Sequence, residues 1–297
     1  MTELNRPIPI APAGAPAKRV LLLTHRAPEH TSGALDTVLG ILDECGVEVL
    51  VPPVEVAKHA RLEKYVSSED VELRGGGEDL IVVLGGDGSM LRALAREAGA
   101  GTPVIGVNFG RVGFLCSIER FDLEHGLRRA LRGEYVVIAL PSLTVDWSDG
   151  SVRAVNDLAL VRSGETRIAD LSFAIDGEKV ATVRCDGVVC STPVGSTAYN
   201  LAAGGPTVSW RVRCFVLSFL AGHHLDTRPL VIAPEEQLVV TNSAIWGDCD
   251  VLADGAKVGS LAPGRQITVG LGGADVHLAI FPEASFFRRY REKFGRG

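Results

Sequence analysis

Two short segments of the sequence combine residue types that are suited to phosphate chemistry. In the first, an apolar run at 80–84 leads directly into Gly85-Gly86-Asp87-Gly88-Ser89. Glycines let the backbone approach a ligand closely, and the free N–H groups at the start of a following helix attract an anion. We therefore predict a phosphate site here, with the Asp87 carboxylate placed to act on the molecule that carries the phosphate. The alternative is a tight turn in which Asp87 is an ordinary turn residue.

The second segment begins at Asp186 and reads Asp-Gly-Val-Val-Cys-Ser-Thr-Pro-Val-Gly-Ser-Thr-Ala-Tyr-Asn-Leu-Ala-Ala-Gly-Gly-Pro to residue 206. Its hydroxyl groups are crowded together, at Ser191, Thr192, Ser196, Thr197 and Tyr199. A loop of this kind after an apolar strand supplies donors and acceptors for a polar ligand, and its glycines again permit close approach. We predict a ligand-binding loop. A solubilising surface loop, with Tyr199 as a core aromatic, is the alternative.

The elements around these segments predict two folding units. Between 18 and 125, strand-like and helix-like segments alternate, with strands at 19–23, 47–51, 80–84 and 104–107 and helices at 35–45 and 90–98. This order is typical of a parallel sheet covered by helices. Asp87 and Asn108 then both follow the carboxyl ends of strands, where open α/β sheets bind their ligands.

The remaining segments have a different character. Beyond residue 125 they become short, β-like and separated by turn signals, which predicts an all-β domain at 126–270. Residues 1–17 are rich in proline and alanine and are predicted to be a disordered tail. The last segment, 271–297, contains a predicted helix at 283–295.

Composition narrows the classes of function. The chain has 30 Lys and Arg against 36 Asp and Glu, a net charge of −6 and no long basic run, which argues against nucleic acid and membranes as partners. No stretch of 18 apolar residues predicts a membrane span. The six cysteines lack the spacing of a metal site and several have apolar neighbours. We therefore expect no metal site from the protein, reduced thiols and a cytoplasmic location.

Four motifs occur here in the order found in NAD kinases: GGDGS at 85–89, NFGRVGFL at 108–115, Asn156-Asp157, and the long segment at 186–206. The chain resembles a bacterial ATP-NAD kinase of the actinobacterial kind over roughly residues 18 to 295. GGDG is shared with phosphofructokinases and lipid kinases, whereas STPVGSTAY with the trailing GGP is highly specific. The resemblance implies a Rossmann-like α/β domain with a mostly parallel sheet, an all-β NAD-binding domain, a C-terminal segment that packs back on the first domain, and a homodimer or homotetramer.

The resemblance also implies an activity. NAD kinases transfer the γ-phosphoryl group of ATP to the 2′-hydroxyl of the adenosine ribose of NAD, which gives NADP. Mg²⁺ accompanies the ATP, and polyphosphate is an alternative donor. Asp87 is then the general base. The NAD-binding residues are Gly88, Asn156, Asp157, Asp186, Ser196, Thr197, Ala198 and Tyr199, and those for the phosphates of ATP are Gly85, Gly86, Arg92 and Asn108.

Several positions depart from the family pattern. Asp157 stands where Glu is usual, Val194 where Thr is usual, and Ala256 where Gln is common. These departures fit an alternative, a weakly active or non-catalytic NAD-binding paralogue that acts as a sensor. A GGDG kinase acting on a lipid or a sugar is a further alternative, which the hydroxyl-rich second segment disfavours.

Overall fold

The protein divides into two compact units. The computed structural model describes residues 10–12, 15–65, 77–110, 113–164, 168–223, 227–272 and 276–295. The α/β unit comprises Pro9–Ala139 and Val276–Gly297, and the β unit comprises Leu140–Asp275. The predicted fold class, an α/β unit followed by an all-β unit with a C-terminal helix that returns to the first, is confirmed.

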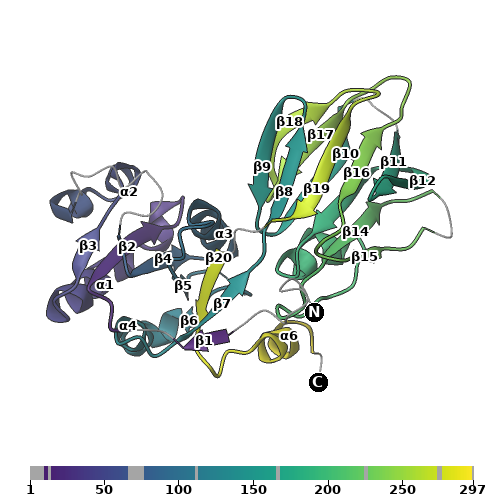
Figure 1. Cartoon of the computed structure of the whole chain (residues 1–297). Coiled ribbons are helices and arrows are strands. Elements are labelled where there is room, and N and C mark those ends of the chain that lie inside the picture. Colours follow the sequence, from purple (N-terminus) through teal and green to yellow (C-terminus); the bar gives the residue numbers. More distant parts are fainter. Residues whose placement is uncertain are drawn as a thin grey trace. The chain divides into compact units, whose positions relative to one another are not determined.

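One mostly parallel sheet forms the centre of the α/β unit (Figure 1). Its strand order is β1–β7–β20–β5–β4–β2–β3, with β6 beside β5. The strands are β1 (Ile10–Pro12), β2 (Arg19–Thr24), β3 (Glu48–Leu50), β4 (Leu80–Gly85), β5 (Val104–Asn108), β6 (Ile118–Glu119), β7 (Val136–Leu140) and β20 (Val276–Ile280). The helices are η2 (Pro28–His30), α1 (Ser32–Glu44), α2 (Pro53–Lys58), η3 (Ala60–Tyr65), α3 (Asp87–Arg96), η4 (Arg120–Asp122), α4 (Leu123–Leu131) and α6 (Phe286–Phe294).

Helices cover both faces of this sheet, which explains its continuous apolar strands. Every residue of β4 is buried, as expected for a parallel strand with both faces covered. Helices α1 and α4 share a core cluster with alternate residues of the strands, among them Val20, Leu22 and Val82. The intervening Leu21, Ile81 and Val83 are also fully buried, and they belong to the face that carries α3.

Two predicted boundaries differ in the structure. The domain boundary predicted at 126 falls inside α4 (Leu123–Leu131), whose Leu127, Ala130 and Leu131 pack into the α/β core, so the change of unit comes at 139/140 instead. The tail predicted over 1–17 contains a strand, because Ile10–Pro12 pair antiparallel with β7 at the sheet edge. An edge strand tolerates the missing N–H of Pro12. Residues 1–9 and 13–14 lie outside the described residues.

The β unit consists of two antiparallel sheets packed face to face. Their orders are β15–β14–β13–β10–β17–β18 and β12–β11–β16–β19–β8–β9. The bounds are β8 (Leu143–Trp147), β9 (Gly150–Ala154), β10 (Asp157–Arg162), β11 (Ala169–Ile175), β12 (Glu178–Cys185), β13 (Gly187–Ser191), η5 (Gly195–Thr197), α5 (Tyr199–Ala202), β14 (Phe215–Leu220), β15 (Leu230–Ile232), β16 (Leu238–Asn242), β17 (Cys249–Ala253), β18 (Ala256–Leu261) and β19 (Gln266–Leu271). Inward-facing residues of both sheets, such as Leu160 and Phe173, form one shared core.

Across the described residues, every helix is too short or too polar to cross a lipid bilayer.

Candidate functional site

The predicted strand–turn–helix junction forms a candidate site in the α/β unit. Strand β4 ends at Gly85, Gly86 is the N-cap, and α3 begins at Asp87, three residues earlier than the sequence periodicity predicts. The N–H groups of Ser89 and Met90 bond back to Gly86 O, so the loop itself forms the first helical turn. A Cβ at Gly85 would lie 2.4 Å from Ser89 Oγ, which explains why only glycine fits there.

The Asp87 carboxylate is held by the loop that follows β5. Its oxygens accept N–H groups from Phe114 and Leu115 at 2.8–2.9 Å. Gly113 leaves room beside it, since a Cβ there would lie 3.2 Å from Asp87 Oδ1. Asp87 is therefore fixed in orientation by main-chain donors, a partner set that the sequence did not indicate.

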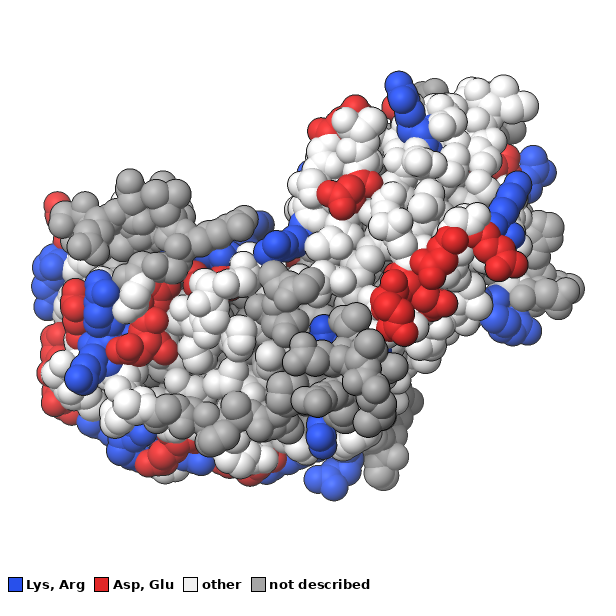
Figure 2. Space-filling model, in the orientation of Figure 1, with Lys and Arg blue, Asp and Glu red and all other residues white. Residues whose placement is uncertain are grey.

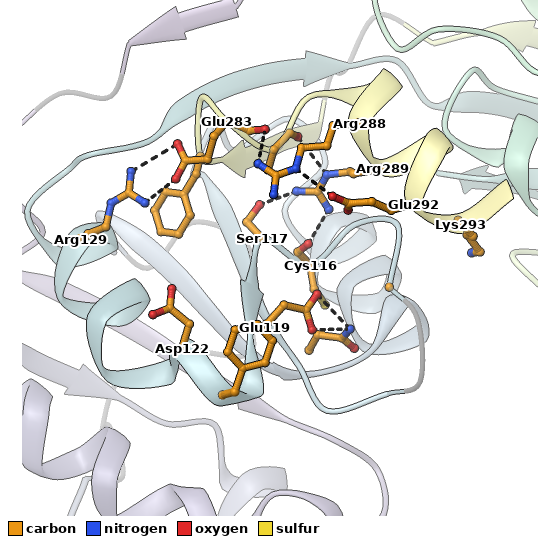
Figure 3. A pocket seen from close by; sticks show the side chains of 15 residues that line it. Cys116, Ser117, Glu119, Asp122, Arg129, Glu283, Arg288, Arg289, Glu292 and Lys293 are labelled. Carbon is orange, nitrogen blue, oxygen red and sulfur yellow. Dashed lines mark hydrogen bonds and ion pairs between the residues drawn. The ribbon is translucent and has the colours of Figure 1, made fainter. Parts of the chain in front are cut away.

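Helix α6 holds the same loop from the other side (Figure 3). The Arg289 guanidinium is 7% exposed and donates to Phe114 O at 2.8 Å, to Cys116 O and to Ser117 Oγ at 2.8 Å. Its Nε donates to Ala284 O within the same C-terminal segment. Burial lowers the pKa of Arg289, and the nearby negative charges of Asp87 and Glu119 act in the opposite direction. Arg289 thus ties the last helix to the loop that orients Asp87.

Two further predicted phosphate ligands lie near this junction. Asn108, the last residue of β5, accepts the N–H of Gly110 at 2.9 Å and donates to Glu119 at 3.2 Å. Arg92 is exposed on α3 and donates to Gly88 O and Ser89 Oγ. The structure therefore brings Gly85, Gly86, Asp87, Gly88, Arg92 and Asn108 to the carboxyl edge of the sheet, as the sequence predicted.

A second candidate site lies in the β unit, where strand β10 begins beside the ends of β13 and β17. Strand β10 begins at Asp157, which pairs with Ser191 at the end of β13, and Leu158 pairs with Ala253 at the end of β17. Thr192 N–H donates to Asn156 O at 2.9 Å. A Cβ at Gly195 would lie 2.1 Å from the same carbonyl oxygen, so glycine is required for the hydroxyl-rich loop to reach Asn156.

One buried polar atom beside this loop has no hydrogen-bond partner among the described residues. The Asn156 Oδ1 atom is buried and accepts no hydrogen bond within the described part of the chain. Buried polar atoms are nearly always hydrogen-bonded in proteins, so an orphaned acceptor indicates a missing donor. A ligand hydroxyl or amino group would supply one.

Asp254 organises the main chain here, and sequence reasoning did not place it in the site. Its carboxylate accepts N–H groups from Val155, Asn156 and Asp157 at 2.7–3.2 Å. Asp254 has φ +48° and is followed by Gly255, which forms the turn between β17 and β18. The Asp-Gly pair was a visible turn signal, but nothing local in the sequence indicates that its carboxylate reaches Asn156.

Asp157 is a buried acid with a strongly altered proton affinity. Its side chain is 5% exposed. Burial, and next the negative charge of Asp254, raise its pKa to about 7, against a smaller opposing effect of the Tyr199 main chain. Burial raises the pKa of Asp254 as well, and the N–H groups of Val155, Asn156 and Asp157 act against this rise. Asp157 is therefore protonated at mildly acidic pH.

This shift predicts a specific pH dependence of stability. Because the folded-state pKa of Asp157 lies above its unfolded value, its contribution to stability decreases as pH rises from about 4 to about 7. We expect Asp157→Asn to gain melting temperature relative to wild type at about pH 8 and to gain little at about pH 5. Thermal unfolding at both pH values checks this. Asp186→Asn, an exposed carboxylate of the same unit, is the control, and an equal gain at both pH values would contradict the assignment.

In the hydroxyl-rich loop, some side chains are buried and bond within the protein, whereas others are exposed. Ser196 is fully buried, and its Oγ lies 2.7 Å from Pro193 O and accepts the N–H of Val208 at 2.9 Å. These bonds hold the loop, and the role of Ser196 in NAD binding stays a prediction. Thr197 is partly buried and bonds Val194 O at 3.3 Å. Ala198 precedes α5, and Tyr199 at its start is 41% exposed, which removes the core-aromatic alternative.

Within a single chain, Asp186 lies apart from the residues around Asn156. It lies before Gly187, at the opposite end of β13 from Ser191, and forms an ion pair with Arg162 at 2.9 Å. A five-residue strand separates the two ends by roughly 15 Å at about 3.3 Å per residue. Asp186 and Ser191 therefore lie apart within a single chain, and the role of Asp186 in NAD binding stays a prediction.

Acidic and basic side chains are interspersed over the α/β unit on the face seen in Figure 2. Among the described residues, no group of three or more His, Cys, Asp or Glu side chains is arranged to hold a metal ion.

Comparisons with known proteins give a consistent result. Residues 21–135 match the ATP-NAD kinase N-terminal domain, and residues 155–279 match the ATP-NAD kinase C-terminal domain. The NAD kinase of Corynebacterium diphtheriae is 31% identical over 282 residues, which are 92% of this chain and 89% of that protein. An NAD kinase from Archaeoglobus fulgidus, solved in complex with ATP, superposes with a TM-score of 0.71 at 28% identity. The superposition covers 93% of this chain and 97% of the Archaeoglobus chain. Yeast NADH kinase complexed with NADH has the same fold, with a TM-score of 0.84 at 22% identity, covering 95% of this chain and 89% of its own.

Proposed function

The chain belongs to the NAD kinase family, an enzyme family that phosphorylates NAD with ATP, and on that premise we propose how its own residues perform the reaction. The γ-phosphoryl group of ATP is transferred to the 2′-hydroxyl of the adenosine ribose of NAD, with Asp87 as general base. The observation that carries this proposal is the position of Asp87. Its carboxylate follows a buried parallel strand, at the sheet edge where such folds bind ligands, and is fixed by Phe114 and Leu115.

In the proposed transfer, one bond to the γ-phosphorus forms as another breaks. The ribose 2′-oxygen attacks the γ-phosphorus, the bond from that phosphorus to the β–γ bridging oxygen breaks, and ADP leaves. The ribose hydroxyl proton passes to the Asp87 carboxylate. A carboxylate offers about four lone-pair sites, and two main-chain N–H groups donate to Asp87, that of Phe114 to both oxygens and that of Leu115 to Oδ1. Lone pairs therefore remain for the substrate hydroxyl.

We further propose that the second candidate site binds NAD. Asn156 Oδ1 and the Asp157 carboxyl suit ribose or amide hydrogen-bond donors, and Thr197, Ala198 and Tyr199 lie in the adjoining loop. Tyr199 offers an aromatic face to a base. Asp186 would contribute only through a second copy of the chain, which is the role that a homodimer or homotetramer with shared sites would give it.

Mg²⁺ is proposed to arrive with the donor. Phosphate oxygens and water are the preferred ligands of this ion, and it neutralises the phosphate charge during transfer. The carboxylates in the candidate site of the α/β unit are engaged by main-chain and amide donors, as with Asp87 and Glu119. We therefore assign the ion to the phosphates of ATP rather than to protein ligands.

Replacing Tyr199 with Ala is expected to weaken NAD binding about 10-fold without loss of fold, because stacking on a base contributes roughly 1–3 kcal/mol. Calorimetric titration with NAD measures the affinity, and thermal unfolding checks the fold. Val258→Ala is a suitable control, since Val258 is 40% exposed in the same unit, close to the 41% of Tyr199. Unchanged NAD affinity in Tyr199→Ala would remove the stacking role.

The proposed function is tested with the full chain, NAD, ATP and Mg²⁺, coupled to a dehydrogenase that accepts only NADP. Formation of NADP supports the kinase, and replacing NAD by NADH identifies the preferred acceptor. Tight NAD binding without NADP formation would instead identify a sensor. The absence of both would contradict the proposal.

A further inference from the structure

Two buried glutamates lie at the amino edge of the parallel sheet, opposite to the edge that carries Asp87. Glu78 comes two residues before β4, and Glu97 follows α3 as its C-cap. The Ile81 N–H donates to Pro103 O at 2.9 Å, which places the segment before β4 beside the loop that follows Glu97. The strand pairing therefore brings both glutamates to one edge of the sheet, far from the proposed base along α3.

Neither glutamate has the hydrogen bonds that a buried carboxyl group needs. Glu97 is 1% exposed and Glu78 is 7% exposed, and all four of their carboxyl oxygens are buried without a hydrogen-bond partner among the described residues. Buried polar side chains are nearly always hydrogen-bonded in proteins. The neighbouring Asp79 is the ordinary case, since its carboxylate accepts the N–H groups of Lys18 and Arg19 at 2.8 and 2.9 Å. The orphaned oxygens of Glu78 and Glu97 therefore indicate a missing partner.

The negative charges of the two glutamates are close enough to repel each other. Burial raises the pKa of Glu97, and the charge of Glu78 raises it further. Arg96 acts against this rise, with its Nε 3.4 Å from Glu97 Oε1, and so does the buried Thr102 hydroxyl. The C-terminal end of α3 adds partial negative charge at the same place. Two buried carboxyl groups thus face the single guanidinium of Arg96.

Arg19 does not supply the second positive charge. Its guanidinium reaches the same edge, where it donates to Gly77 O at 3.2 Å, and its Nε pairs with Glu48 at 3.1 Å. Within the described ranges, Glu78 forms no ion pair with Arg19 or with Arg96. A buried carboxylate without a counter-charge is costly, so a cation from outside the chain would relieve this edge of the sheet.

We propose that Glu78 and Glu97 bind a divalent metal ion of the oxygen-preferring class, such as Ca²⁺ or Mg²⁺, with the Thr102 hydroxyl as a further ligand. Carboxylate and other oxygen ligands are those that these ions prefer, and two carboxylates match a double positive charge. Bound there, the ion joins the end of α3 to the segments before β4 and β5. It stabilises the helix that begins at Asp87 from its far end, and it is distinct from the Mg²⁺ that arrives with ATP.

Thermal unfolding of the full chain, without NAD or ATP, tests this site. After metal ions are removed with a chelator, we expect the melting temperature to rise by roughly 5–10 °C when Ca²⁺ or Mg²⁺ is added at about 100 times its Kd. Calorimetric titration should show one ion bound per chain. KCl at the same ionic strength is the control, and an equal rise with KCl would overturn the site, because it would show a general effect of salt.

Glu78→Gln and Glu97→Gln keep the shapes of the side chains and remove one charge each. Each variant should lose most of the metal-dependent rise in melting temperature. Each should also bind the ion at least about 10-fold more weakly, because an interaction with a charged group is lost. Glu124→Gln removes an exposed carboxylate from α4 of the same unit, so it is the matched control and should retain the wild-type response.

A proton shared between the two carboxyl groups is the alternative to the metal ion. With Ca²⁺ or Mg²⁺ present, the metal site predicts that wild type melts at a higher temperature than both variants. If a proton is shared, Gln replaces a neutral acid, and the variants should melt at or above the wild-type temperature with and without metal. That result would overturn the site, as would an unchanged metal-dependent rise in both variants. Should neither variant fold, Thr102→Val takes their place, with the same expected loss and the same overturning result.

Discussion

Replacing Asp87 with Asn is expected to lower the turnover of NADP formation by at least about 10²-fold, the lower end of the usual contribution of general-base catalysis. The amide keeps the shape of the carboxylate but cannot accept the ribose proton. NAD affinity should change little, because the residues proposed to bind NAD belong mainly to the other unit. Steady-state kinetics with NAD and ATP and a calorimetric titration with NAD measure the two effects.

The hydrogen bonds of Asp87 require a control for this experiment. Because Phe114 and Leu115 donate to the carboxylate, Asn places an N–H₂ group against one of these donors and weakens the loop. A purely structural Asp87 would show its effect as a lower melting temperature of the α/β unit. Loss of turnover with a melting temperature near that of wild type supports the base. Near-normal turnover from the folded variant would contradict it.

Local patterns made the candidate site of the α/β unit predictable. The strand at Leu80–Gly85, the glycines and the helix after them are specified by neighbouring residues, since burial, backbone freedom and periodicity all act over a few positions. The same reasoning placed Asn108 at the end of a parallel strand. What it could not supply were the partners of Asp87, because the N–H groups of Phe114 and Leu115 come from a loop after the next strand.

The second candidate site shows a different limit. Ser196 and Tyr199 belong to one motif, yet the Ser196 hydroxyl is hydrogen-bonded within the protein and Tyr199 is exposed. A hydroxyl group in a sequence does not state whether its partner is the protein or a ligand. Asp186 belongs to the same motif but lies at the far end of a strand. Asp254-Gly255 is a visible turn signal, but only the packing of strands brings the Asp254 carboxylate to Asn156.

Replacing Arg289 with Met is the second change for which we expect a large effect. Its guanidinium serves acceptors on Phe114, Cys116, Ser117 and Ala284, all of which lose their donor in the variant. Leaving a buried acceptor without its donor costs roughly 1–3 kcal/mol, and several acceptors are affected at once, so we expect the melting temperature of the α/β unit to fall by roughly 5–15 °C. Arg291→Met, an exposed arginine of the same helix, is the matched control and should retain wild-type stability.

Arg289 should also affect turnover, because it acts on Asp87 through the loop that both residues bind. Measured well below the melting temperature, kcat should fall about 10²-fold from misplacement of the base, with unchanged NAD affinity. Arg289→Lys keeps the charge but cannot donate to all four acceptors. Its kcat should therefore lie between those of Arg289→Met and wild type. The decisive measurement is the Asp87→Asn/Arg289→Met double variant. If Arg289 only positions Asp87, the double variant should be scarcely slower than Asp87→Asn alone, whereas fully additive losses would show that Arg289 acts independently of the base.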